Sequence, residues 1–258
     1  MRCNLCENTT FTNMGPRLNV RCTKCGSLER TRLLWLYLQR LNLAGKTRVL
    51  HIAPERGLYD ALRGVVAAKN YVCADFDPAL FPFAPGCRQI DLRQLAHWPA
   101  EEFDLILHSH VLEHIPCNIA SPLFHLHRML RPSGKHVFVI PFMGGNYEES
   151  FEEMPEAERV QRFGQNDHVR RFGRNDVPMH IGSILRLPTD WDAQRDFTAQ
   201  ELEEINIPRE QWSGFNGSTV FVLDRSDMLG FDRPRSWAWR WRRPILAGSG
   251  REAEGEGG

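Results

Sequence analysis

The chain has 258 residues, of which 42% are hydrophobic and 10% aromatic, enough to bury a core and too many for a chain disordered throughout. Its 32 basic and 32 acidic residues cancel to a formal charge of +0, which excludes a general attraction to nucleic acid or anionic membranes. No stretch approaches the roughly 20 apolar residues of a membrane span, and the N-terminus lacks the apolar region of a signal peptide. We therefore expect a soluble, cytoplasmic protein.

Four of the seven cysteines lie in two CxxC pairs near the N-terminus, with fifteen residues between the pairs. Two such turns aim four thiolates at one point and complete a closed tetrahedral zinc site, which leaves no open position for catalysis. A redox CxxC is the alternative, but the pairs lie away from any βαβ unit. The sequence predicts a structural zinc ribbon over residues 1–26, with the ligands Cys3, Cys6, Cys22 and Cys25.

A helix is predicted next, over residues 27–45, with Ser27 as its N-cap and a broad leucine face. Short β-rich runs then alternate with helical stretches, which is typical of a doubly wound, mostly parallel α/β sheet. The predicted strands are 47–53, 71–75, 88–91, 103–109, 135–141 and 219–224, with a turn at 132–134. The predicted helices are 57–68, 119–130 and parts of 148–163 and 198–206.

Acidic residues follow the second and third of these strands, at Asp75, Asp77 and Asp91. In doubly wound sheets, ligands bind at the carboxyl ends of the strands, so these carboxylates are candidates for ligand binding. The alternative is that each only caps a helix or solvates a loop.

The order and spacing of these elements, with FDLILHSHVLEHIP and MLRPSG, resemble the class I S-adenosylmethionine-dependent methyltransferases over residues 47–141. More narrowly, the chain resembles a bacterial subgroup of these enzymes that carries an N-terminal zinc ribbon. This resemblance extends from Cys3 to about Gly173 and rests on the segments CxxCGSLER, LLWLYL, VLHIAPE and FGQNDHVRRFG. The resemblance implies a Rossmann-like domain, taken here as 46–232, that binds S-adenosylmethionine.

The resemblance also implies residue roles. Asp75 would bind the ribose hydroxyls, and Asp91 the adenine amine, with Leu92 beside the ring. The turn after the first strand departs from the family pattern, which has an acid and a GxGxG run there. The cofactor-binding residues expected from this turn and from the end of the fourth strand are His51, Ala53, Glu55, Gly57 and Ser109. Within this set, His51 would replace the usual acid, and Glu55 would reach the cofactor's amino group.

Three residues of HVLEH, at His110, Glu113 and His114, also match the HxxEH pattern of zinc peptidases. Pro116 leaves barely one helical turn there, which argues against a ligand-bearing helix. We expect His110 to orient the substrate or take its proton, with a half-buried structural histidine as the alternative, and His168 is the second candidate base. His114 is expected to face the next helix in a structural role.

Residues 142–218 are expected to hold a substrate-facing insertion, in which Asp167, Arg170 and Arg171 contact substrate, with a solvated loop as the alternative. The glutamates of 148–158 are expected on the exposed face of a lid-like helix, with recognition of a cationic substrate as the alternative. Residues 233–258 are expected to form a basic aromatic tail that ends in a disordered Gly/Glu-rich stretch. Its arginines and tryptophans would cover an apolar patch of the domain or of a second copy in a homodimer, or bind RNA.

The sequence therefore predicts methyl transfer to an oxygen or nitrogen of a small molecule or a glycan-type biosynthetic intermediate. One alternative is an RNA methyltransferase that grips RNA with the ribbon and the tail. The other is a non-catalytic binding protein, suggested by the missing glycines of the turn.

Overall fold

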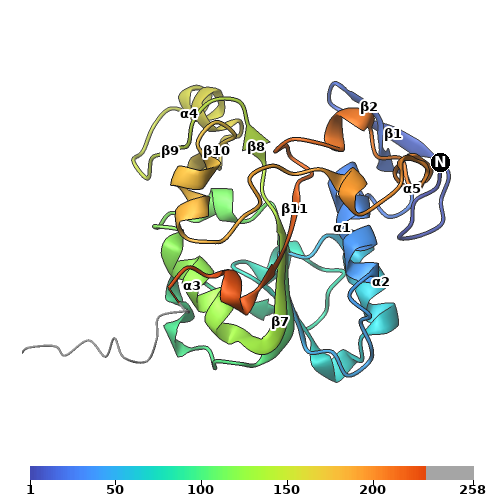
Figure 1. Ribbon diagram of the computed structural model, residues 1–258, viewed down its shortest axis with the longest axis horizontal. Coiled ribbons are helices and arrows are strands. Elements are labelled where there is room, and N and C mark those ends of the chain that lie inside the picture. Colours follow the sequence, from blue (N-terminus) through green and yellow to red (C-terminus); the bar gives the residue numbers. More distant parts are fainter. Residues whose placement is uncertain (231–258) are drawn as a thin grey trace, which may run out of the picture.

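A computed structural model describes residues 1–230 and shows a central sheet with helices on both faces (Figure 1). Six strands form the sheet, in the spatial order β11-β7-β6-β3-β4-β5. β11 runs antiparallel to β7, and the other neighbouring pairs are parallel. The strands are β3 (Val49–Ile52), β4 (Tyr71–Asp75), β5 (Arg88–Gln89), β6 (Phe103–Ser109), β7 (Leu130–Val139) and β11 (Val220–Asp224). The expected doubly wound, mostly parallel α/β fold is confirmed.

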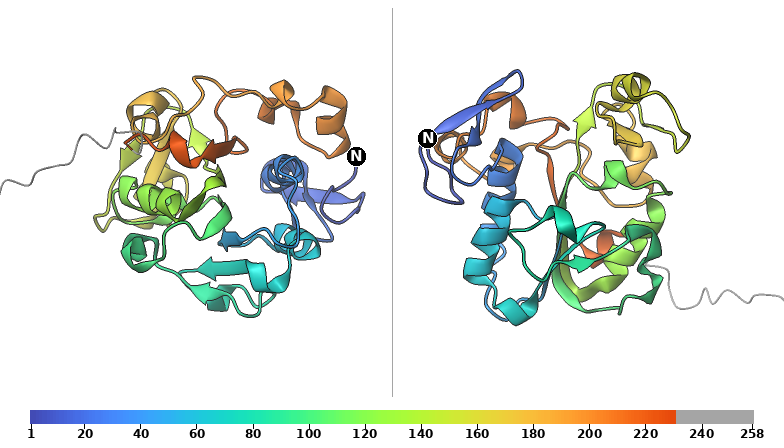
Figure 2. Two further views of the ribbon diagram at one scale, coloured as in Figure 1. Left: turned by 60° about the horizontal axis from the view of Figure 1, so that its bottom comes forward. Right: turned by 180° about the vertical axis from the view of Figure 1, so that it is seen from behind.

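Side chains of the central strands alternate between two apolar cores, one on each face of the sheet, as the period of a strand requires. On one face, α1 (Glu29–Gln39) and α2 (Arg56–Val65) cover a core that includes Val49. On the other face, α3 (Ala120–Met129) covers a core that includes Leu50. Figure 2 shows these helices on opposite sides of the sheet. Both faces are buried, which explains the near-continuous apolar runs of the strands.

The N-terminal hairpin pairs β1 (Phe11–Met14) with β2 (Arg17–Cys22) and lies beside the short helix α5 (Ala199–Glu204) (Figure 1). A buried arginine, Arg32 of α1, holds these parts together. Its guanidinium donates hydrogen bonds to the carbonyl oxygens of Val20, Ser27, Ile205 and Asn206 at 2.7–2.9 Å. The ribbon is therefore fixed to the helical layer of the large domain.

A second small sheet, in the order β8-β10-β9, lies across the upper part of the molecule from the hairpin (Figure 1). It consists of β8 (Phe142–Met143), β9 (Glu148–Glu149) and β10 (Arg170–Gly173), with α4 (Glu156–Phe163) beside it. These elements lie within the predicted insertion. The glutamates at 148 and 149 form β9, so the helix expected from 148 begins only at Glu156.

Two local predictions are wrong. Leu28, not Ser27, is the N-cap residue of α1, because the Ser27 hydroxyl is engaged by cysteine sulfurs. The turn predicted at 132–134 lies within β7, which pairs with β6 from Leu130 onward through a register shift. Gly134 allows this path, since a Cβ there would lie 2.8 Å from the carbonyl oxygen of Phe103.

No helix within residues 1–230 combines the length and apolarity that a membrane crossing requires. The basic aromatic tail predicted over 233–258 lies outside the described residues.

Candidate functional site

The four N-terminal cysteines converge. The sulfurs of Cys3 and Cys25 lie 3.6 Å apart, and those of Cys6 and Cys22 lie 3.5 Å apart. Thiolates around a tetrahedral zinc ion with bonds of about 2.3 Å would lie about 3.8 Å apart, whereas a disulfide needs about 2.0 Å. The Ser27 hydroxyl lies 3.2 Å from the sulfurs of Cys3 and Cys25. The cluster therefore fits the predicted zinc ion.

This cysteine cluster packs on the turn between β3 and α2. Gly57 is buried against Cys25, and a Cβ at this glycine would lie 3.1 Å from the Cys25 sulfur. The Glu55 carboxylate accepts hydrogen bonds from Arg30 at 2.7 Å and from the Thr31 hydroxyl at 2.8 Å. Both residues of the turn thus contact the N-terminal part of the chain.

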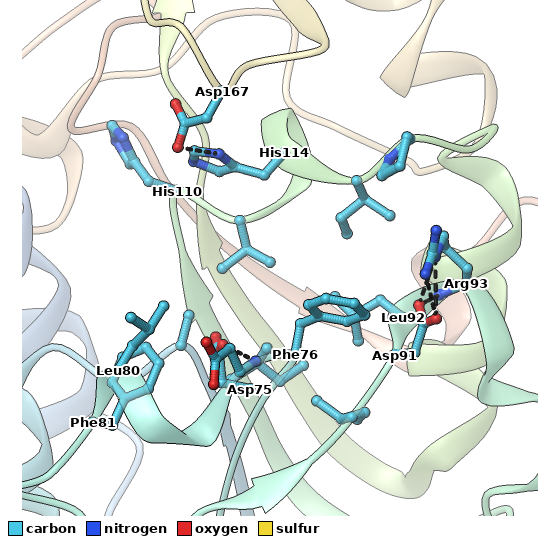
Figure 3. Close-up of a pocket in the computed structure, with 17 residues that line it drawn as sticks. Asp75, Phe76, Leu80, Phe81, Asp91, Leu92, Arg93, His110, His114 and Asp167 are labelled. Atoms are coloured by element: carbon cyan, nitrogen blue, oxygen red, sulfur yellow. Dashed lines mark hydrogen bonds and ion pairs between the residues drawn. The ribbon is translucent and has the colours of Figure 1, made fainter. Parts of the chain in front are cut away.

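A cavity of about 550 Å³, the first cavity, opens at the carboxyl ends of β3, β4 and β6 (Figure 3). Its walls are largely apolar, with the strand-end acids among them. Its lining residues are Ile52, Ala53, Asp75, Phe76, Asp77, Leu80, Phe81, Ile90, Asp91, Leu92, Arg93, His110, Val111, His114, Ile115, Pro116 and Asp167. Its volume is in the range of cofactor pockets.

Asp75 ends β4, and its carboxylate accepts a hydrogen bond from the backbone N–H of Asp77 at 2.8 Å. Burial raises the pKa of this carboxyl above its usual value. Phe76 lies between the carboxylates of Asp75 and Asp91, and Leu92 lies close to it (Figure 3). An apolar slot flanked by an acid on each side fits an aromatic ring that carries polar groups at both ends.

The Asp91 carboxylate already has partners. It caps the 3-10 helix Leu92–His97 through the backbone N–H of Arg93, and the Arg93 guanidinium donates to both of its oxygens at 2.8–3.1 Å. Hydrogen bonding from Arg93 lowers the pKa of this carboxyl. Asp91 thus lines the cavity as half of an ion pair.

Three other predicted cofactor residues lie elsewhere. His51, within β3, lines neither this cavity nor the polar cavity beside it, and its Nδ1 lies 2.6 Å from the Tyr71 hydroxyl. Burial lowers the pKa of His51 to about 3, so this imidazole is neutral. Glu55 and Ser109 line the adjoining polar cavity instead.

That adjoining cavity, the second cavity, has a volume of about 520 Å³ and shares Ala53, His110 and His114 with the first. Its walls are polar and come from the strand ends, the hairpin, α1 and the α4–β10 loop. Its lining residues are Met14, Arg17, Glu29, Arg30, Ala53, Glu55, Ser109, His110, Glu113, His114, Gln165, His168, Gln211 and Gly217. Sequence reasoning missed the hairpin's part in this wall, because only the packing of the ribbon brings Met14 and Arg17 there.

Backbone strain marks the junction of the two cavities. Ala53 follows β3 with φ +50°, and His110 follows β6 with φ +54°. Both strands are neighbours in the sheet, so two adjacent strand ends turn sharply at one place. Non-glycine residues rarely adopt this conformation, and such strain concentrates at functional sites.

His110 is fixed by two contacts at this junction. Its Nε2 lies 3.0 Å from the carbonyl oxygen of Gly217, which can only accept, so Nε2 carries the proton and Nδ1 is left as an acceptor. Nδ1 lies 3.5 Å from the Glu113 carboxylate. Burial is the main cause that lowers the pKa of His110 and raises that of Glu113 to about 8.

His114 and His168 lie together in the second cavity, with ring centroids 4.7 Å apart. The Nδ1 atom of His114 lies 3.2 Å from the Asp167 carboxylate, and Nδ1 of His168 lies 2.9 Å from the carbonyl oxygen of Phe163. His114 therefore faces the cavity, and the expectation that it faces the next helix is wrong. Asp167 is brought to the site through this contact (Figure 3).

Arg170 and Arg171 line neither cavity. Arg170 is fully buried and donates to the carbonyl oxygens of Leu112 and Cys117, with Glu149 as its ion-pair partner at 3.3 Å. Arg171 pairs with Glu148 at 3.1 Å. Within the described chain, these arginines hold the site's loops instead of facing its interior.

Comparison with known proteins gives one family match. Residues 53–138, from the turn after β3 to the end of β7, match the family model described as "Methyltransferase domain". No curated protein matches the chain. The match supports a methyltransferase domain over the strands that border the first cavity.

Solved structures that resemble the chain include the YcgJ protein from Bacillus subtilis, with 16% identity and a TM-score of 0.43. That likeness covers 69% of this chain and 79% of the other. An S-adenosylmethionine-dependent methyltransferase from Mesorhizobium loti is 19% identical, with a TM-score of 0.35 over 46% of this chain and 60% of that one. With TM-scores below 0.5, these structures are too distant to assign a substrate or a site residue to this chain.

Proposed function

We propose that the protein transfers the methyl group of S-adenosylmethionine to an oxygen or nitrogen of a small polar molecule or a glycan-type intermediate. The observation that carries this proposal is the pair of adjoining cavities, one apolar with strand-end acids and one polar, which meet at His110. Methyl transfer requires a cofactor and an acceptor in contact at a single point. The family match over the same strands supports the choice of reaction.

In this proposal the first cavity holds the cofactor, which supplies an electrophilic methyl group on a sulfonium sulfur. Asp75 would accept hydrogen bonds from the ribose hydroxyls, and Leu92 would pack beside the adenine, with Asp91 near its amine. Ala53 would border the methionine portion through its backbone. His51, Glu55 and Gly57 drop out of the proposed cofactor set, because none of them lines the first cavity.

The second cavity would hold the acceptor. Its volume suits a small molecule, and its mixture of carboxylates, arginines and imidazoles suits a polar one. An acceptor lone pair forms the new bond to the methyl carbon while the carbon–sulfur bond breaks, and that electron pair remains on sulfur. His110, with Nδ1 as a hydrogen-bond acceptor, is our candidate for orienting the acceptor and taking its proton.

We also propose that the four-cysteine cluster holds a structural zinc ion. Its role would be to fix the hairpin whose Met14 and Arg17 form part of the acceptor wall. The ribbon would then contribute to the shape of the acceptor site as well as to stability.

Calorimetric titration with S-adenosylmethionine and S-adenosylhomocysteine tests the cofactor site. Asp75→Asn should weaken binding about ten- to hundredfold, the range expected when hydrogen bonds to a charged group are weakened. The matched control is Asp60→Asn on the exposed face of α2, which should bind like the parent protein. Absence of binding to the parent protein would contradict the proposal and favour a non-catalytic role.

Transfer of label from methyl-labelled cofactor to a fractionated cell extract tests the acceptor class. Label in the small-molecule or glycan fraction is expected. Label in RNA would reject the small acceptor while leaving methyl transfer in place, and no label in any fraction would reject the enzyme.

A further inference from the structure

The floor of the second cavity holds a carboxylate without a hydrogen-bond partner. The Glu113 side chain is fully buried, and neither of its oxygens has a hydrogen-bond partner within residues 1–230, although Nδ1 of His110 lies 3.5 Å from one of them. A buried carboxylate in this condition is strongly unfavourable, and native structures explain such groups with an ion, a water or a protonation event.

Two imidazoles lie near this carboxylate, and their hydrogen bonds resemble those of metal-bound histidines. The Nδ1–H group of His114 is directed to the Asp167 carboxylate, and the Nδ1–H group of His168 donates to the carbonyl oxygen of Phe163. This fixes the tautomer and leaves both Nε2 atoms as lone-pair donors, as in metal-bound histidines, whose other nitrogen bonds a carboxylate or carbonyl.

The distances fit one ion. One ligand atom from each of Glu113, His114 and His168 lies within 4.8 Å of the other two, and Nε2 of His114 is 3.9 Å from Oε1 of Glu113. Ligands bound at about 2.1 Å around a common ion lie about 3 to 4 Å apart, so small side-chain movements complete the site. All three residues also line the second cavity, which leaves further coordination positions open to it.

We propose that Glu113, His114 and His168 bind a divalent transition-metal ion whose open positions face the second cavity. Two imidazoles and one carboxylate suit zinc and its first-row neighbours, and they disfavour Mg²⁺ and Ca²⁺, which prefer all-oxygen sites. The set differs from the HxxEH pattern, because His168 of the α4–β10 loop takes the place of His110.

The role of the ion, which rests on the proposed function, is to hold the acceptor. An acceptor hydroxyl bound to the ion loses its proton more readily, since the positive charge stabilises the oxyanion. His168 is then a metal ligand and not a base, and His110, at the junction with the first cavity, receives the proton.

The competing explanation needs no metal. Glu113 would be protonated and would donate to Nδ1 of His110, 3.5 Å away, which also satisfies a buried carboxyl. The two explanations differ in whether His168 matters for ion binding, and this makes His168 the decisive residue.

The experiment is a titration of Co²⁺ into the full-length protein after a chelator has removed all zinc except that of the four-cysteine cluster, followed by visible absorption. Thiolate sites hold zinc more tightly than Co²⁺, so the added ion reports on the second site. We expect one binding event per chain, lost in His168→Gln and weakened about ten- to hundredfold in Asp167→Asn, whose carboxylate only positions His114. His97→Gln, an exposed histidine outside both cavities, is the control and should bind like the parent protein.

Elemental analysis after zinc loading and gel filtration gives an independent count, expected at two zinc ions per chain and one in His168→Gln. A single zinc in the parent protein, or Co²⁺ binding retained in folded His168→Gln, would overturn the proposal. Circular dichroism checks that each variant is folded. S-adenosylhomocysteine titration of His168→Gln separates the metal site from the cofactor site, because the first cavity should bind the cofactor with or without the second metal.

Discussion

Gly57 lies so close to Cys25 that a Cβ on the glycine would meet the cysteine sulfur at 3.1 Å. This glycine is the only one left of the three expected in the turn after β3, and the resemblance assigns it to the cofactor. The contact shows another reason for its presence. The start of α2 packs on the thiolate cluster, so the turn that borders the first cavity is built against the ribbon.

Gly57→Ala should therefore lower stability. The added methyl group must displace Cys25 or the start of α2, and overpacking of this kind costs about 1–3 kcal/mol. The matched control is Gly64→Ala in the same helix, where a Cβ meets nothing within 4 Å and should stabilise by about 0.5–1 kcal/mol. Thermal unfolding of both variants measures the effect. Equal melting temperatures would mean that the ribbon does not press on α2 in solution.

Removal of zinc should weaken cofactor binding as well as stability. Without the ion the ribbon loses its fold, because structural zinc supplies much of the folding free energy of such small modules. The start of α2 then loses its packing against Cys25, and the turn that carries Ala53 is released. Calorimetric titration of S-adenosylhomocysteine into Cys25→Ser, compared with the free thiol variant Cys117→Ser, measures the coupling. Unchanged affinity in folded Cys25→Ser would show that the ribbon and the cofactor turn are independent.

The sequence predicts the strands well where the pattern within a few neighbouring residues is enough, as with apolar runs that end in a polar residue. The strands over 71–75 and 103–109 agree with the structure to the residue, because apolar runs buried on both faces have clear ends. The turn expected at 132–134 failed because Pro and Gly also occur where a strand shifts register. The small sheet of β8, β9 and β10 has strands of two to four residues, too short for any periodicity to appear.

The predicted site residues also fall into two groups, those positioned by the end of a strand and those whose role depends on tertiary contacts. Asp75, Asp91, Leu92 and His110 reach the cavities because the end of a strand determines their position. Arg170 and Glu55 have chemistry that suits a ligand, and only tertiary contacts show that the fold itself uses it. Glu113 is the opposite case, since its sequence pattern suggests a peptidase helix, whereas its burial without a hydrogen-bond partner among the described residues is visible only in three dimensions.

The strained backbone at Ala53 predicts a size-dependent effect. Glycine adopts the φ of +50° found at Ala53 without strain, whereas a β-branched side chain at this φ clashes with its own backbone. Ala53→Val should lower the free energy of unfolding by more than about 1–2 kcal/mol and weaken S-adenosylhomocysteine binding, whereas Ala53→Gly should keep both near the parent values. Denaturant unfolding and calorimetry on the two variants measure this. Valine accepted without loss would show that the turn relaxes to negative φ in solution.

Substitution of Arg170 and of Arg171 tests whether each arginine stabilises the fold or binds substrate. Arg170→Met keeps roughly the same volume but removes the guanidinium donors from the carbonyl oxygens of Leu112 and Cys117, which should lower stability by about 2–4 kcal/mol. Arg171→Met removes a partly exposed pair with Glu148 and should cost at most about 1 kcal/mol. Because Leu112 adjoins Glu113, losing the Arg170 anchor should also loosen the second cavity. Denaturant unfolding gives the stabilities, and labelled methyl transfer gives the activities. A stable Arg170→Met protein that binds S-adenosylhomocysteine normally and transfers no methyl group would instead assign this guanidinium to the substrate, as the sequence alone suggests.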